Sequence, residues 1–170
     1  MTQQTGRRRL GAGGRVLAVV VAALLAGTGC VASGQQPGQA TGAVADALAE
    51  AGSAGETARL AVELLDQGRI TGPVADTTLL DQLHTLDDAD FALTTLVPPD
   101  AASSDHRTAG LEAVGDVSDA VVAARAWVAA RSGGDVAGAQ DVPASAEELL
   151  SDLATALDTT DAALAEAGGP

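Results

Sequence analysis

The chain of 170 residues contains no lysine, asparagine or tyrosine, and only one tryptophan, one phenylalanine and one cysteine. A single cysteine excludes an internal disulfide. With so few aromatic side chains, any core must consist mainly of Leu, Val and Ala, which allows close helix approach but buries less apolar surface per residue. Most of the missing residue types have AT-rich codons, which indicates a high-GC bacterial genome. Because such a genome favours arginine over lysine, the absence of lysine is weak evidence for a function.

Acidic residues are absent from the first 30 positions, where the parts of an export signal follow one another. Basic residues at Arg7–Arg9 and Arg15 precede an apolar run from Val16 to Leu25, and small residues then lead to Cys30. The apolar run of ten residues is short against the ~20 that a helix needs to cross a bilayer. The segment is therefore typical of a signal peptide.

The segment from Leu24 to Cys30 resembles the lipobox of bacterial lipoproteins, whose cysteine is lipidated and becomes the first residue after cleavage. Gly27 stands where this family usually has leucine, and Leu25 lies two residues before it. The resemblance implies a signal peptide over residues 1–29 and a lipid anchor, such as palmitate, on Cys30. The protein would then lie on the extracytoplasmic face of the cell membrane. A lone free thiol in an oxidising compartment would be a liability, and lipidation removes it.

Two other fates of the N-terminus remain open. An ordinary signal peptidase could cut at the small-x-small pattern from Cys30 to Ala32 and release the protein. An uncleaved segment extended through Ala32 would approach the lower length limit of a membrane-spanning helix. Residues Arg7 to Leu10 resemble a twin-arginine export signal, but Gly11 falls where a second apolar residue is expected, so Sec export is equally supported.

Charge is distributed unevenly along the chain. All 23 acidic residues lie after Cys30 but only five of the nine basic ones do, which gives this part a formal charge of −18. Such a surface repels nucleic acid and anionic phospholipid, so no nucleic-acid partner is expected. The charge favours a solvated surface over an acidic patch that recruits a basic partner or gathers divalent cations.

The part after the signal divides into a tether and one domain. Residues 30–40, of which Val31 to Ala40 are rich in Gly, Gln and Ser, have little to bury and predict a flexible tether. Residues 41–168 suffice for one domain with a core but not for a two-lobed solute-binding lipoprotein. This part is similar in general pattern to short, Ala-rich lipoproteins of high-GC bacteria, a likeness that implies no mechanism.

The first predicted helix, from Thr41 to Gln67, carries a heptad seam and is followed by Gly68 as a C-terminal cap. Gly52 and Gly55, with Ser53 and Glu56 as a capping-box pair, offer a break into two shorter helices. The seam keeps its phase through both glycines, so one helix, straight or kinked, is favoured. Its positions are Val44, Leu48, Ala51, Gly55, Ala58, Val62 and Leu65.

Three further amphipathic segments follow, joined by short Gly and Pro turns. The second opens at Pro73 and ends before Pro98 and Pro99, the third runs from about Asp105 to Arg131, and the fourth starts near Pro143 and ends at Gly168. Their apolar positions are Leu79, Leu80, Leu83, Leu86, Phe91, Leu93 and Leu96; Val114, Val117, Val121, Ala124 and Val128; and Leu150, Leu153, Leu157 and Leu164. Ser145 and Glu148 form a capping box before the fourth. No segment shows strand alternation, so the sequence predicts an all-α, antiparallel up-down four-helix bundle.

The best metal candidate is the pair Asp81 and His84, an Asp-x-x-His at helical spacing, with Asp88 nearby. A di-iron bundle needs two Glu-x-x-His motifs on separate helices and two more Glu. His106, near the start of the third helix, could approach the far end of the second, but His84 lies several turns from that end. The pattern favours solvated surface residues over a metal site, and no cofactor is expected.

Catalytic motifs are equally weak. Residues Ser103 to His106 predict a polar loop and lack the Gly-x-Ser-x-Gly elbow of serine hydrolases. Adjacent carboxylates such as Asp87 with Asp88, or Glu147 with Glu148, diverge by about 100 degrees on a helix and do not face one substrate. The second pair suits the positive end of a helix dipole. We therefore expect no enzymatic activity.

Trp127 is the candidate partner contact, with Arg131 one helical turn later and in reach of a cation–π contact. The favoured alternative is that the indole covers one end of the bundle. Together the patterns predict a membrane-anchored, non-enzymatic binding or scaffolding module with an envelope protein as partner. A small metal- or ligand-binding bundle is the second hypothesis.

Overall fold

Four helices make up the part of the chain that the computed structural model describes, which is residues 36–133, 143 and 145–168. They are α2 (Pro37–Asp66), α3 (Gly72–Thr95), α4 (Ala101–Arg131) and α5 (Ala146–Glu166), and no strand occurs among the described residues. The all-α four-helix prediction is confirmed. The signal segment, with Gly27 and Cys30, lies outside the described residues.

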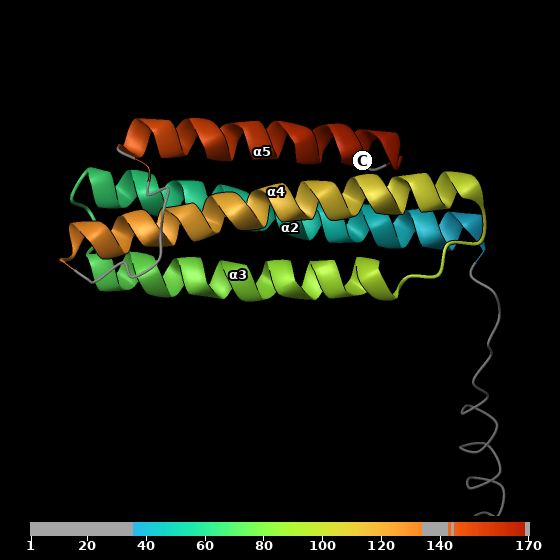
Figure 1. The fold of residues 1–170 in the computed structure, drawn as a ribbon, viewed down its shortest axis with the longest axis horizontal. Helices are drawn as coiled ribbons and strands as arrows, with labels where there is room; N and C mark the ends of the chain where they lie inside the picture. Colours follow the sequence, from blue (N-terminus) through green and yellow to red (C-terminus); the bar gives the residue numbers. More distant parts are fainter. Residues whose placement is uncertain (1–35, 134–142, 144, 169–170) are drawn as a thin grey trace, which may run out of the picture. The chain divides into compact units, whose positions relative to one another are not determined.

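The helices alternate in direction along the chain (Figure 1). Helices α2 and α4 run parallel, contact each other and both contact α3 and α5. Helices α3 and α5 share no contact and lie on opposite sides of this central pair. The bundle therefore depends on the α2–α4 contact, because each outer helix packs against both central ones.

Helix α2 begins earlier than the sequence pattern indicates. Pro37 stands in its first turn, where a missing N–H costs nothing, and the Gln36 N–H donates to Gln39 Oε1 at 3.3 Å. Ala40 is completely buried. Residues 37–40 thus belong to the bundle, and their assignment to the tether was wrong because the tether's composition conceals a proline-initiated turn. Of the tether, residues 30–35 lie outside the described residues.

Helix α2 continues unbroken through Gly52 and Gly55, as the heptad phase predicts. All seven seam positions are buried, and Gly68 follows the helix in the left-handed conformation with φ 66°. A Cβ at Gly55 would lie 2.9 Å from Leu157 Cδ2 of α5 and 3.1 Å from Val117 Cγ1 of α4. This glycine therefore serves close helix packing and does not break the helix.

Helix α4 has a matching glycine. A Cβ at Gly110 would lie 3.3 Å from Val44 Cγ1 of α2 and 3.3 Å from Leu93 Cδ1 of α3. Each central helix thus places a glycine against a valine of the other, Gly55 against Val117 and Gly110 against Val44. A Cβ at either glycine would lie closer to the facing valine than ordinary van der Waals contact. A larger residue at either position would therefore force its neighbours to move.

The start of α4 also differs from the prediction. Asp100 caps the helix by accepting the Ser103 N–H at 2.8 Å, so helix begins at Ala101 and not at about Asp105. The predicted polar loop from Ser103 to His106 is wrong, because these residues are helical and the Ser103 side chain is buried. The start of α5 is as predicted, since Ser145 Oγ accepts the Glu148 N–H at 3.2 Å.

The core face of α3 was only partly predicted. Leu80 is 37 % exposed and Phe91 is 68 % exposed, so neither belongs to the core. Ala75 and Ala89 are completely buried in their place. The true seam has spacing 4, 3, 4, 3, 4, 3 and consists of Ala75, Leu79, Gln82, Leu86, Ala89, Leu93 and Leu96. This seam was hard to recognise because it contains two alanines and a glutamine, whereas the larger apolar residues Leu80 and Phe91 lie on the outer face.

The outer ends of α5 show a smaller difference. Leu153 and Leu157 are buried as predicted, whereas Leu150 and Leu164 are half-buried. Leu149, which the predicted pattern omitted, is completely buried. The apolar face of α5 is therefore rotated slightly from the one the sequence indicates.

Replacing Gly55 by leucine should lower the free energy of unfolding by about 1–3 kcal/mol, because the side chain must displace Leu157 and Val117. The matched control is Gly42→Leu on the same helix, where a Cβ meets nothing within 4 Å. There leucine should stabilise, by up to about 1 kcal/mol, through helix propensity. Urea unfolding followed by circular dichroism measures both; equal effects would contradict close packing at Gly55.

Candidate interaction surfaces

Three of the arginines bind groups on neighbouring elements, and all three belong to α4. Arg125 Nε donates to Asp76 Oδ1 of α3 at 2.9 Å, and Arg131 Nη1 lies 3.3 Å from Asp66 Oδ1 of α2. Arg107 Nη1 donates to the Leu96 carbonyl, just after α3, at 3.1 Å. These cations therefore link α4 to α2, to α3 and to the connection after α3, and most carboxylates of the described residues are left facing solvent.

Trp127 and Arg131 form the cation–π pair that their spacing predicts, with the guanidinium carbon 4.7 Å from the ring centroid. Trp127 is only 5 % exposed and belongs to the core cluster. The buried ring has little surface to offer a partner, so its packing agrees with the bundle-end interpretation. Arg131 remains half-exposed and also pairs with Asp66.

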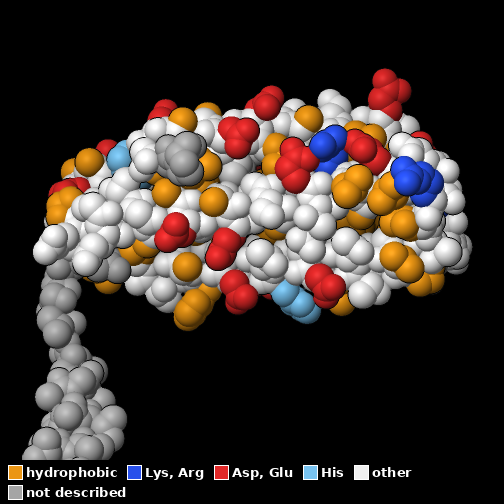
Figure 2. All heavy atoms as spheres, turned by 180° about the vertical axis from the view of Figure 1, so that it is seen from behind, with side chains coloured by type: hydrophobic (Ala, Val, Ile, Leu, Met, Phe, Trp, Pro, Cys, Tyr) orange, Lys and Arg blue, Asp and Glu red, His pale blue; other side chains and the backbone are white. Residues whose placement is uncertain are grey.

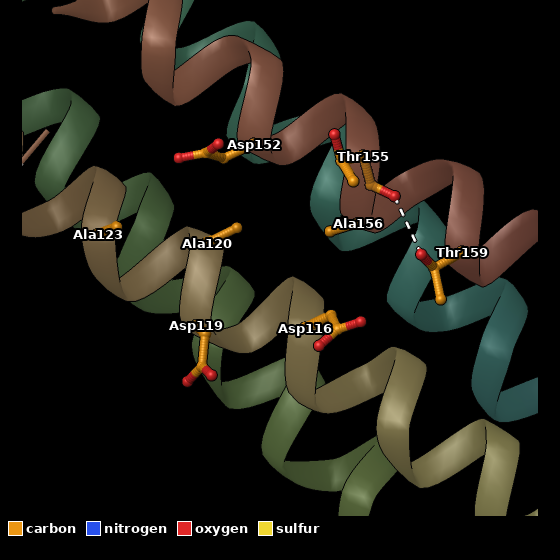
Figure 3. A pocket seen from close by; sticks show the side chains of 8 residues that line it. All are labelled: Asp116, Asp119, Ala120, Ala123, Asp152, Thr155, Ala156 and Thr159. Atoms are coloured by element: carbon orange, nitrogen blue, oxygen red, sulfur yellow. Dashed lines mark hydrogen bonds between the residues drawn. The ribbon is translucent and has the colours of Figure 1, made fainter.

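A groove of about 440 Å³ runs between α4 and α5 (Figure 3). Three alanines line it, Ala120, Ala123 and Ala156, together with Thr155 and Thr159. Its carboxylates are those of Asp116, Asp119 and Asp152. Figure 3 shows them pointing in different directions, with that of Asp119 turned away from α5. The groove offers negative charge but no converging set of ligand oxygens.

A second groove, of about 510 Å³, lies where the first turn of α3 meets the last turn of α4. Its charged lining residues are Asp76 and Arg125, which pair with each other. The hydroxyl of Ser132, also in the lining, donates to the Val128 carbonyl at 2.9 Å. The polar groups of this groove are therefore already occupied within the protein.

The metal candidates Asp81, His84 and Asp88 are exposed side chains of α3. Among residues 36–133, 143 and 145–168, no three His, Cys, Asp or Glu side chains come close enough together to hold a metal ion. The start of α4 does meet the end of α3, as proposed for His106. Within this same part of the chain, His106 Nδ1 and Arg107 Nε are buried without a hydrogen-bond partner.

The α3–α4 connection is the surface that the sequence patterns did not single out. Val97 is 75 % exposed, and Pro99, Ala101 and Ala102 are also exposed, beside a half-buried Pro98. We call Val97, Pro98, Pro99, Ala101 and Ala102 the apolar tip. The sequence does contain a largely apolar run from Val97 to Ala102. Its two prolines indicated the end of a helix, and the exposure of the run could not be seen from the sequence.

Asp100 is the one charged residue within this run; it is exposed, and its Oδ1 accepts the Ser103 N–H. The hydrogen bond from the Ser103 N–H, aided by the Ser103 hydroxyl and the charge of His106, lowers the pKa of the Asp100 carboxyl below its usual range. A folded-state pKa below the unfolded one means that the ionised cap stabilises the fold above the unfolded pKa. That stabilisation is lost as the pH falls through the folded-state pKa.

Comparison with protein-family models, curated proteins and solved structures gives no match.

Asp100→Asn should melt at a lower temperature than the wild type at neutral pH, and the difference should disappear in acid. Asparagine still accepts the Ser103 N–H but carries no charge to stabilise, so only the wild type loses stability at this site on acidification. Thermal melts from about pH 7 to about pH 2 measure the difference. Asp100→Ala, which removes the acceptor, should be destabilised throughout; a constant gap between wild type and Asp100→Asn would contradict the role of the charge.

Proposed function

We propose that the protein is an extracytoplasmic lipoprotein, held to the cell membrane by lipid on Cys30. The observation that carries this proposal is the order of basic, apolar and small residues leading to the single cysteine. In the described residues, no helix is both long and apolar enough to span a bilayer.

We further propose that the bundle is a non-enzymatic binding module for another component of the cell envelope. The support is its charge, −18 after Cys30, combined with arginines that bind within the bundle. On the face shown in Figure 2, carboxylates are spread along the bundle while arginine side chains gather toward one end. Such a surface attracts a partner with a basic face and steers its approach. A metal-binding bundle has less support, since Asp81, His84 and Asp88 form no three-ligand group.

Cells that express the wild type should incorporate labelled palmitate into the protein, and Cys30→Ala should not, because the thiol is the only acceptor of the lipid. Gly27→Leu, which restores the usual lipobox residue, should be labelled at least as well as the wild type. Gel fluorography after metabolic labelling measures incorporation. Equal labelling of wild type and Cys30→Ala, or none in either, would remove the lipoprotein proposal.

Cross-linking in intact cells should capture one specific envelope component with the wild type. Two triple variants test different faces of the bundle. One neutralises the carboxylates of the α4–α5 groove, Asp116→Asn/Asp119→Asn/Asp152→Asn. The other neutralises carboxylates of α3, Asp81→Asn/Asp87→Asn/Asp88→Asn. A binding module that uses one face should lose capture in one variant and keep it in the other. Equal loss in both would indicate unspecific charge attraction, and the absence of any recurrent cross-link would contradict a binding role.

A further inference from the structure

The two ends of the bundle differ in polarity. The end formed by the α2–α3 connection and the last turn of α4 exposes Asp66, Arg69 and Arg131. The other end carries the apolar tip, of which Val97 is the most exposed large apolar residue described. Asp100 within the tip is exposed and caps the start of α4, where its Oδ1 accepts the Ser103 N–H. One end is thus suited to water and the other to an apolar or interfacial surrounding.

Phe91 extends this apolar end along α3. It is the only phenylalanine of the chain and is 68 % exposed. It lies four residues before the last residue of α3, Thr95, which places it about 6 Å back along the helix axis. Amphipathic elements bury their apolar side chains about 5–10 Å into the boundary between headgroups and acyl chains. Phe91 therefore lies about one helical turn behind the end of α3 that carries the apolar tip.

The chain from the proposed anchor enters the bundle at this same end. Figure 1 shows the first residues of α2 next to the α3–α4 connection. Because α2 begins at Pro37, only five residues, Val31 to Gln35, separate Cys30 from Gln36. Even fully extended, this length spans about 20 Å. A lipid on Cys30 would hold the tip that close to the bilayer, which raises its effective concentration at the membrane surface.

Charge decides which part of the bundle can touch the membrane. The flanks of the helices carry exposed carboxylates along their whole length, and an anionic lipid surface repels them within a Debye length of about 8 Å. The apolar tip carries one exposed carboxylate, that of Asp100. Contact through the tip therefore brings fewer carboxylates to the lipid surface than contact along a flank.

We propose that the apolar tip and Phe91 insert into the interfacial region of the membrane that carries the lipid on Cys30, so that the bundle stands on its α3–α4 end. This inference rests on the lipid anchor of the proposed function and specifies how the anchored domain is oriented. The end with Arg69 and Arg131 then points away from the bilayer. The acidic flanks stay accessible to a partner.

The test uses the full lipidated protein in vesicles of phosphatidylethanolamine and phosphatidylglycerol. Lipidation blocks the Cys30 thiol, so a cysteine introduced at Val97 is the only one that takes up a polarity-sensitive thiol dye. The matched control is Val74→Cys, a 51 % exposed residue near the opposite end of α3. We expect blue-shifted emission and quenching by lipid-borne nitroxides at position 97, and the spectrum of a water-exposed dye at position 74.

A second pair of variants tests the contribution of Phe91. With the dye at position 97, Phe91→Ser should lower the ratio of inserted to free tip about tenfold, because a large apolar side chain no longer leaves water. Leu60→Ser on α2, which replaces a 51 % exposed side chain far from the tip, should leave the ratio unchanged. Circular dichroism of each variant verifies that the bundle is folded.

The outcomes separate this inference from the proposal on which it rests. A water-exposed spectrum at position 97 in protein that mass spectrometry shows to be lipidated would overturn the insertion and leave the anchor intact. Protein without lipid on Cys30 would overturn both. A dye at position 97 that is shielded in cells but exposed in pure vesicles would assign the tip to a protein partner and overturn membrane insertion.

Discussion

The bundle depends on the close approach of its two central helices, where Gly55 of α2 meets Val117 of α4 and Gly110 of α4 meets Val44 of α2. With so few aromatic side chains, the core gains little from any one residue and must gain from dense contact between Leu, Val and Ala. The two glycines provide this contact by letting opposing valines approach the backbone. Helices α3 and α5 can then each pack against both members of the pair.

The same arrangement determines the surface. Arg107, Arg125 and Arg131 all lie on α4 and bind groups of α2, α3 and the connection after α3. Positive charge is thereby consumed at helix contacts, and the outer faces keep an excess of carboxylates. Of these cations only Arg107 reaches the α3–α4 connection, where it binds the Leu96 carbonyl, and Val97 beside it stays exposed. The acidic flanks and the apolar tip are the features on which we base the proposals of a basic partner at the side and lipid at the end.

Most of the correct predictions of buried positions and helix starts came from heptad spacing and from local capping motifs. The seven positions of the α2 seam are all buried, and Ser145 caps the start of α5 as the sequence indicates. Both signals act between neighbours in sequence, so they can be found without a structure. The cation–π pair of Trp127 and Arg131 was predictable for the same reason.

The sequence alone determined a helical bundle with four segments, because helix period, proline starts and glycine ends are encoded locally. Only the tertiary structure decided that Ala75 and Ala89, and not Leu80 and Phe91, face the core of α3. It alone also gave Gly55 its packing role and brought the tip next to the start of α2. Burial depends on which neighbouring helix a residue meets, and neither hydrophobicity nor spacing along one segment specifies that neighbour.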